Sequence, residues 1–206
     1  MPKTKEQTEQ IRAESREKIL STARRLFAAR GFNGCNVSDI AREAGMSQGN
    51  IYWYFPSKKD IYMAILSEGF SDLGNLMAQT AGSSGTALEK LDQYLKEFFR
   101  LMREEGGDEF VAIVTPLLAQ SGPEGMADFG ISTHEVGAGY HASLNAIFSQ
   151  GQEEGTFNNE VDPNILSTFL FGFTNGLMLM YPDVWRDIPE DILRKAILRL
   201  LGASPD

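Results

Sequence analysis

The spacing of apolar positions between residues 36 and 60 predicts two short helices, a tight turn between them and the start of a third helix. Asn36 is placed to cap the first helix, and Gly45 follows its last apolar position, where a left-handed residue ends a helix most easily. Helix, short glycine-containing turn and helix is the spacing of a DNA-reading helix-turn-helix. The apolar positions of the first helix recur at i, i+3, i+4 and i+7: Val37, Ile40, Ala41 and Ala44.

The second short helix is predicted to run from residue 48 to 55, with Ser47 as its cap and Pro56 as its stop. Only Ile51 and Phe55 are needed to anchor it in a core. Packing of its aromatic rings on a neighbouring helix is the alternative to exposure. An exposed face of amide and phenol groups suits contact with base edges and phosphates. That face would consist of Gln48, Asn50, Tyr52, Trp53 and Tyr54.

Helical spacing continues along the rest of the chain, and no strand-like alternation accompanies it, so the sequence predicts an all-α fold. Residues 1–10 are polar and are expected to fray. Breaks are expected at AGSSGT (81–86), EEGGDE (104–109) and SGPEG (121–125). The remaining helices are expected at about 11–30, 58–80, 87–105, 110–120, 131–152, 163–181 and 189–201.

The segment 163–181 is apolar on nearly every side, which sets it apart from the other predicted helices. Such a helix needs one partner within its own domain and a second partner elsewhere. Gly172 and Gly176 form a pair of small residues that permits close approach of another helix. The segment is too short and too interrupted by polar residues to span a membrane, and no membrane partner is expected.

Charge is distributed unevenly along the chain. The whole sequence of 206 residues carries a formal net charge of −9, which by itself argues against a nucleic-acid partner. Residues 1–60, however, hold 11 basic against 7 acidic side chains, whereas residues 61–206 hold 8 against 21. A basic head on an acidic body should approach DNA head first.

Motifs for catalysis or cofactors are missing from the sequence: there is no phosphate-binding loop, dinucleotide fingerprint or nucleophile elbow. No cofactor, metal or catalytic residue is predicted. His134 and Glu135 open like a zinc-protease motif, but Ala138 stands where the second ligand belongs. An enzyme that uses His134, Glu135 and His141 is the remaining alternative of that class. The single Cys35 excludes an intramolecular disulfide and suits a reducing cytosol, and we expect it to be a small buried hydrophobe.

Two stretches, REKILSTARRLFAARGF and VSDIAREAGMSQGNIYWYFPSKKDIY, resemble the DNA-binding head of the TetR family of bacterial transcriptional repressors. The shared pattern is a first helix ending in Gly-Phe, an IA-x-x-AG-x-S turn, and an aromatic recognition helix ending in F-x-SK. The resemblance covers residues 16–70, roughly a quarter of the chain. Trp53 and Tyr54 depart from it, since the family more often has Tyr or His there, so the operator sequence stays open.

The resemblance implies a helix-turn-helix DNA-binding domain at 11–56 and a helical ligand-binding and dimerisation domain at 57–206, joined by the long helix from 58. A homodimer would form through the last two helices, about 163–181 and 189–201. The expected operator is a palindromic double-stranded DNA. Phosphates would be held by Ser38, Ser47, Tyr54 and Lys58, bases or sugars by Gln48, Asn50, Tyr52 and Trp53, and Gly49 would let the backbone approach.

The body is expected to enclose an effector among its middle helices. Aromatic residues and methionines with few polar groups favour a small, largely apolar effector, although plain core packing explains the same residues. The sequence therefore predicts a cytoplasmic, dimeric repressor, and binding of the effector is expected to release it from DNA. The alternative is an effector-independent activator or architectural DNA-binding protein. The expected lining residues are Phe98, Met102, Phe110, Tyr140, His141, Phe148, Phe169 and Phe173.

Overall fold

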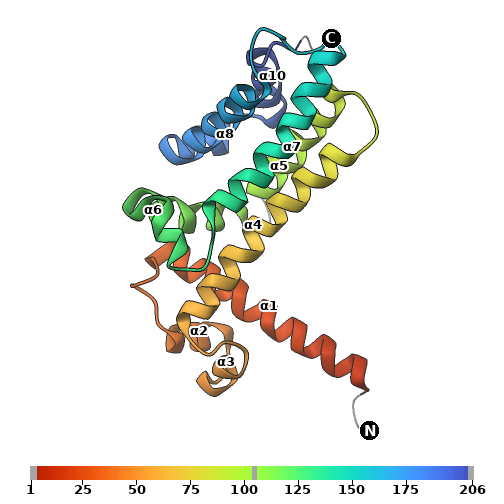
Figure 1. Ribbon diagram of the computed structural model, residues 1–206. Helices are drawn as coiled ribbons and strands as arrows, with labels where there is room; N and C mark the ends of the chain where they lie inside the picture. The colour runs from red at the N-terminus through yellow and green to blue at the C-terminus, as the bar shows by residue number, and fades with distance from the viewer. Residues whose placement is uncertain (1–3, 104–105, 204–206) are drawn as a thin grey trace. The chain divides into compact units, whose positions relative to one another are not determined.

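Every regular element in the described part of the chain is an α-helix, as the sequence predicts. The computed structural model describes residues 4–103 and 106–203, apart from the side chains at 119–125, 133–136, 179 and 182. The helices, shown in Figure 1, are α1 (Lys5–Arg30), α2 (Val37–Ala44), α3 (Gln48–Tyr54), α4 (Lys58–Gly82), α5 (Ala87–Arg103), α6 (Gly107–Ala127), α7 (Thr133–Glu153), α8 (Pro163–Met180), α9 (Pro182–Asp187) and α10 (Glu190–Leu200).

Packing divides the chain into two compact units. The first comprises residues 1–69 together with 108–131, and the second comprises residues 70–107 together with 132–206. The helix α4 continues across the division between residues 69 and 70, while α6 belongs to the first unit although it follows α5 in the chain. This division by packing differs from the functional boundary that the resemblance implies at residue 57.

The first helix begins earlier than expected. Thr4 caps it, with its side chain accepting from the Gln7 amide at 3.2 Å while the Gln7 side chain accepts from the Thr4 amide at 3.1 Å. This capping box satisfies two amides that would otherwise lack partners. Residues 5–10 are therefore helical, and the expectation of a frayed arm over residues 1–10 is wrong for them. Residues 1–3 lie outside the described residues.

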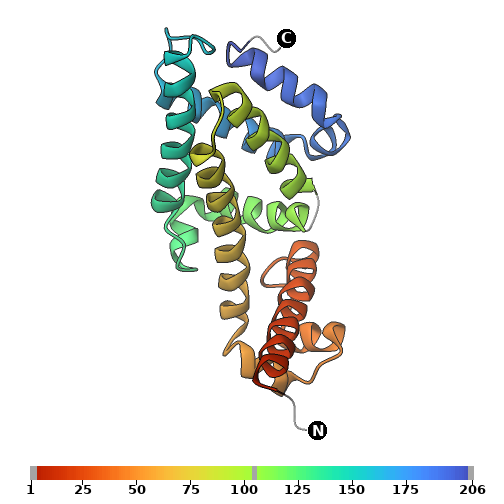
Figure 2. The same cartoon turned by 90° about the vertical axis from the view of Figure 1, so that its right-hand side faces the viewer.

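The core of the first unit forms where the apolar faces of α1, α2, α3 and α4 meet (Figure 2). Phe27, Phe32, Tyr62 and Phe129 add an aromatic cluster, in which the Phe32 ring lies 4.9 Å from that of Tyr62 and 5.5 Å from that of Phe129. Phe129 follows α6, so this cluster attaches the end of α6 to the N-terminal helices. The fully buried aliphatic residues of this core include Ile19, Ala23, Ile40, Ile51, Ile61 and Leu66.

The break expected at SGPEG is wrong, because α6 continues through it to Ala127. Glycine and proline disfavour a helix interior by about 1 and 3 kcal/mol, and tertiary packing can outweigh such penalties. Beyond the expected break, Met126 is fully buried and Phe129 packs on Phe32 and Tyr62. The short helix α9 is not expected from the sequence either, since residues 182–188 fall between the helices predicted at about 163–181 and 189–201.

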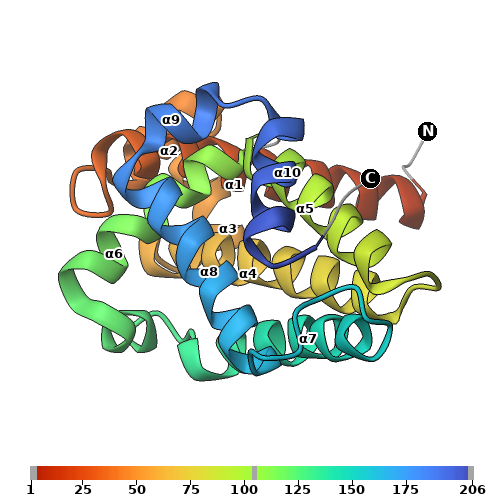
Figure 3. The same ribbon diagram turned by 90° about the horizontal axis from the view of Figure 1, so that it is seen from above.

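The second unit packs α7 against α5 and α8, and α10 against α5 (Figure 3). Glu154, at the end of α7, accepts a hydrogen bond at 2.9 Å from the backbone amide of Ala87, which begins α5. Arg194 of α10 donates at 2.9 Å through its Nε to Asp92 of α5. The first bond joins the end of α7 to the start of α5, and the second joins the interior of α10 to that of α5. Within the described residues, no helix is long and apolar enough to cross a membrane.

We expect the two glycines within α4, Gly69 and Gly74, to respond in opposite ways to alanine. A Cβ at Gly69 would lie 2.3 Å from the buried ring of Phe110, whereas a Cβ at Gly74 would meet nothing within 4 Å. Gly69→Ala should therefore lower the free energy of unfolding by about 1–3 kcal/mol through overpacking. Gly74→Ala should raise it by about 0.5–1 kcal/mol because alanine is the better helix former. Urea unfolding followed by circular dichroism measures both, and equal effects would contradict the Phe110 contact.

Candidate nucleic-acid interface

The turn between α2 and α3 is fixed by local hydrogen bonds, as the sequence predicts. The Asn36 side chain accepts from the Asp39 amide at 2.9 Å, and Asp39 in turn accepts from the Asn36 amide at 3.2 Å. The bond from the Asn36 backbone, with a further one from Arg42, holds the pKa of the Asp39 carboxyl below its usual value. Gly45 ends α2 in the left-handed region, at a φ of 63°, where L side chains are strained.

The helix α3 is anchored on one side and exposed on the other. Ser47 caps it by accepting from the Asn50 amide at 3.2 Å, and Ile51 and Phe55 are buried in the core. The opposite face carries Tyr52, 50% exposed, and Trp53, 58% exposed. Gln48, Gly49 and Asn50 are exposed as well, while Tyr54 is half-buried. All four residues proposed for base contact are therefore accessible to a partner.

The residues proposed for phosphate contact are held in different ways. The Ser47 hydroxyl oxygen accepts from Asn50 within the cap, which leaves its hydrogen to donate to a phosphate oxygen. The half-buried Ser38 hydroxyl donates instead to the Asn36 side chain. Ser38 would have to break that bond before it could donate to a phosphate.

Lys58 is held within the first unit. Its ammonium group donates to the carbonyl oxygens of Phe32 at 2.7 Å and of Cys35 at 2.9 Å, and it lies 4.1 Å from the centre of the Phe32 ring. Two of its three donors are therefore used to fix the loop between α1 and α2. Lys58 thus positions this loop, and the phosphate contact expected from the sequence stays a prediction that would use its third donor.

Cys35 is buried beside this loop, and burial, followed by the charge of Asp39, raises the pKa of its thiol. A thiol that stays protonated is a poor nucleophile. This environment suits the small buried hydrophobe expected from the sequence.

The eight residues proposed to line an effector site are divided between the two units. Phe110 belongs to the first unit, where its ring lies against Gly69. Phe148 is fully buried against Phe157, as an ordinary core residue would be. Phe169 is half exposed and stacks on Phe173, with ring centres 6.2 Å apart. The other four are Phe98, Met102, Tyr140 and His141, which all belong to α5 and α7 of the second unit.

Tyr140 forms a hydrogen bond between two side chains that are buried in the second unit. Its phenol oxygen lies 2.7 Å from that of Tyr94 on α5. Burial raises the pKa of Tyr140 to about 12 and that of Tyr94 well above its usual value, so both phenols stay protonated at neutral pH. Two phenols that share one hydrogen bond use one of their two hydrogens, and the second hydrogen can serve a ligand oxygen.

His141 extends this polar group toward α8. Its Nδ1 lies 3.0 Å from the hydroxyl of Ser167, and its ring lies 5.7 Å from that of Phe171. The sequence analysis missed Tyr94, Ser167 and Phe171. The position of Tyr94, three residues after the buried Leu91, could have revealed it as a member of the inward face of α5.

Comparison with known proteins decides the family. The sequence profile for bacterial regulatory proteins of the tetR family matches residues 19–65, and the profile for the C-terminal region of YsiA-like proteins matches residues 68–181. This chain belongs to the TetR family. It is accordingly a DNA-binding transcriptional regulator and not an enzyme.

Individual members of the family resemble this TetR-family regulator in sequence and in structure. The fatty acid metabolism regulator protein of Bacillus subtilis is 31% identical over 186 residues, which cover 89% of this chain and 91% of that protein. The structure of FadR from Bacillus subtilis in complex with stearoyl-CoA superimposes with a TM-score of 0.70 at 25% identity, covering 90% and 96% of the two chains. The fatty acid degradation regulator FadR from Bacillus halodurans shares the fold, with a TM-score of 0.73 at 22% identity and coverage of 91% and 94%.

The described residues contain no group of three or more histidine, cysteine, aspartate or glutamate residues placed to hold a metal ion. A metal site that includes His134, Glu135 and His141 therefore gains no support from them. The side chains of His134 and Glu135 lie outside the described residues. His141 is engaged with Ser167.

The assignment of Lys58 leads to a prediction with a neighbouring control. Lys58→Met keeps the aliphatic stem but leaves the carbonyls of Phe32 and Cys35 without their donor, which should lower the free energy of unfolding by about 1–3 kcal/mol. Lys59→Met, at an exposed position, should change it by less than about 0.5 kcal/mol. Thermal unfolding followed by circular dichroism measures both. If Lys58→Met kept full stability and lost only DNA affinity, Lys58 would be a phosphate ligand after all.

Proposed function

We propose that this regulator is a dimeric repressor that binds a near-palindromic operator and that a fatty acyl-CoA releases from DNA. The exposed face of α3, held rigid by Ile51 and Phe55, is the observation that carries the proposal. The two α3 helices of a dimer would enter major grooves about one turn apart, at ~34–36 Å. Ser47 and Tyr54 would meet phosphates, and the exposed amide and aromatic groups would meet bases or sugars. The site of action is the cytoplasm.

The face of α8 supports the dimer. Ile165, Phe169, Gly172, Gly176 and Met180 follow one another at i, i+4, i+7, i+11 and i+15, and so line one side of the helix. Within one chain Ile165 is 61% exposed and Met180 68%. A Cβ added at either glycine would meet nothing within 4 Å. An apolar stripe with a gap of this kind suits a partner helix at close range.

The last helix adds a second apolar surface, since Ile192 and Leu200 of α10 are more than half exposed. Leu200 follows the buried Leu193 by seven residues and so lies on nearly the same side of α10, toward its C-terminal end, whereas Ile192 is turned by about 100° from Leu193. A second copy of this chain would cover these side chains together with the stripe on α8. This arrangement supports the dimer through the last two helices.

The chemistry of the second unit supports an acyl-CoA as effector. The Bacillus subtilis relative was solved with stearoyl-CoA bound, and an acyl chain needs apolar surroundings of the kind that Phe98 and Phe171 supply. The thioester carbonyl of such a ligand accepts hydrogen bonds. The phenol hydrogen left over from the pair of Tyr94 and Tyr140 is a donor of the required kind.

The chain connectivity supplies a route from effector to DNA. The helix α6 follows α5 and precedes α7, yet it packs in the first unit. Within that unit, Glu109 pairs with Arg24 of α1 at 3.4 Å, and Phe110 lies against Gly69 of α4. An effector that displaces the adjoining ends of α5 or α7 would therefore pull on a helix that contacts α1 and α4. A tilt of α4 would then change the spacing of the two α3 helices.

Release by stearoyl-CoA tests the proposal. Stearoyl-CoA should weaken binding of a fluorescent operator duplex by about 5- to 150-fold, which corresponds to a coupling of ~1–3 kcal/mol. By linkage, bound operator should weaken stearoyl-CoA binding by the same factor. Fluorescence polarisation and isothermal titration calorimetry measure the two directions, with CoA alone and stearate alone as controls. Operator affinity that stays unchanged while stearoyl-CoA is bound would refute release by this effector.

A further inference from the structure

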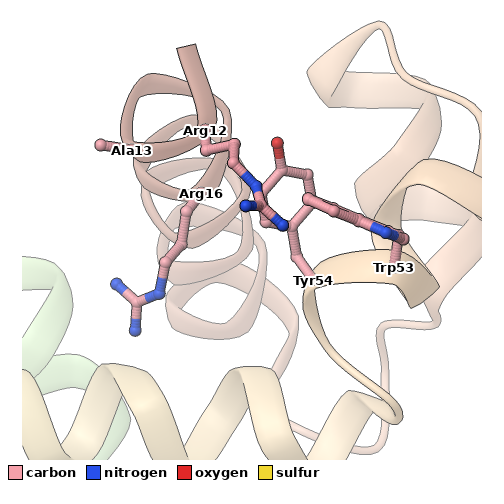
Figure 4. Close-up of a pocket in the computed structure, with 5 residues that line it drawn as sticks. All are labelled: Arg12, Ala13, Arg16, Trp53 and Tyr54. Atoms are coloured by element: carbon pink, nitrogen blue, oxygen red, sulfur yellow. The ribbon is translucent and has the colours of Figure 1, made fainter. Parts of the chain in front are cut away.

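A notch between α1 and α3 lies beside the recognition surface and was not expected from the sequence. It has a volume of about 450 Å³ and is lined by Arg12, Ala13 and Arg16 of α1 and by Trp53 and Tyr54 of α3 (Figure 4). Two guanidinium groups and two aromatic rings thus meet at an open depression. The proposed DNA contacts already include Trp53 and Tyr54, but no role has been given to either arginine.

Arg12 is the more available of the two cations. Its guanidinium lies 4.4 Å from the centre of the Trp53 ring, and Trp53 meets Tyr54 edge to face with ring centres 4.6 Å apart. Figure 4 shows the Arg12 side chain reaching toward these two rings. In the described part of the chain, no carboxylate forms an ion pair with Arg12. The stack leaves the edge of the guanidinium, which carries the N–H donors, open to an acceptor.

Arg16 plays a different part. Its guanidinium pairs with Glu68 of α4 at 2.6 Å and lies 5.5 Å from the ring of Phe55, directed away from Trp53 and Tyr54 (Figure 4). Glu68 offsets one of the two positive charges, so the notch keeps a net positive charge that is centred on Arg12. The occupant that this charge favours is an anion.

Arginine presents its donors in a planar fork that matches two oxygens of a phosphate. Arg12 also stands on a helix whose first turn is capped ahead of it, by the capping box of Thr4 and Gln7. Trp53 and Tyr54 end the helix that enters the major groove, and the phosphates of a duplex flank that groove. A backbone phosphate is therefore the anion that comes within reach of the notch when α3 is bound.

We propose that Arg12, stacked on Trp53, binds a DNA backbone phosphate in this notch, outside the helix-turn-helix, and that Arg16 with Glu68 positions the wall of the notch. The contact rests on the assigned DNA-binding function and deepens it. It does not depend on the effector. The Arg12 contact orients α3 in the groove without reading sequence, so its loss should weaken binding to every duplex alike.

The test compares Arg12→Ala with Arg25→Ala, which removes the same charge from an exposed position of α1 outside the notch. Binding of a duplex of arbitrary sequence is measured by fluorescence polarisation over a range of salt concentrations. Each phosphate contact contributes about 0.9 to the slope of log affinity against log salt. Arg12→Ala should lower that slope by about 0.9, and Arg25→Ala should leave it unchanged. Arg12→Lys, which keeps charge without the fork, should keep the slope and lose affinity.

Three outcomes would overturn the proposal. An unchanged slope in a folded Arg12→Ala protein, verified by its melting curve, would refute the contact alone. A decrease of the salt slope in Arg25→Ala equal to that in Arg12→Ala would show that any positive charge on α1 attracts DNA and that the notch is not a specific phosphate site. An unchanged salt slope in Arg12→Ala, together with a change of tryptophan fluorescence that inorganic phosphate causes at constant ionic strength in the wild type but not in Arg12→Ala, would assign the notch to a small free anion. A wild-type protein that binds no duplex would refute the DNA-binding assignment itself, which separates that failure from the others.

Discussion

The burial of Ile51 and Phe55 is the constraint on which the function of this protein depends. The recognition helix α3 has seven residues, and isolated helices shorter than about 12–15 residues are marginal in water. It persists because Ile51 and Phe55 enter a core built by α1, α2 and α4, and because Ser47 caps its start. Gln48, Asn50 and Tyr52 are thereby exposed and can face DNA, while Trp53 lies against Arg12 and Tyr54 is half-buried.

The same core also receives α6. Phe129, which follows the C-terminal end of α6, packs on Phe32 and Tyr62. Lys58 donates a hydrogen bond to the backbone carbonyl of Phe32. Phe32 is thus shared by the loop after α1, the start of α4 and the segment that follows α6. A displacement of α6 would move residues that pack against the helix-turn-helix. These contacts give the proposed effector response a physical route within the first unit.

Local features were predictable from the sequence, and distant ones were not. The caps at Asn36 and Ser47 and the turn at Gly45 depend on neighbours within a few residues, so their chemistry is visible in the sequence. The end of α6 depends instead on burial of Met126, which outweighs the local signal of glycine and proline. The partners of Lys58 lie 26 and 23 residues away, and nothing nearby in the sequence distinguishes it from the exposed Lys59.

In the candidate sites, too, features that depend on neighbouring residues could be predicted and features that depend on distant residues could not. The exposed residues of α3 could be predicted because a short amphipathic helix has only one inward face. The polar contact of Tyr140 could not be predicted, because its partner Tyr94 lies on a different helix, 46 residues away in the sequence. The notch at Arg12 also needed the structure, since it joins residues about forty positions apart whose proximity depends on the packing of α1 on α2 and of α2 on α3.

The central claim is that α3 reads a specific duplex as part of a dimer. Selection of bound sequences from a random pool of duplex DNA, repeated across salt concentrations, tests it most directly. The account predicts enrichment of one near-palindromic site, with two half-sites about one helical turn apart and an affinity that falls steeply with salt. No enrichment, with equal and weak binding of all sequences at every salt concentration, would contradict it.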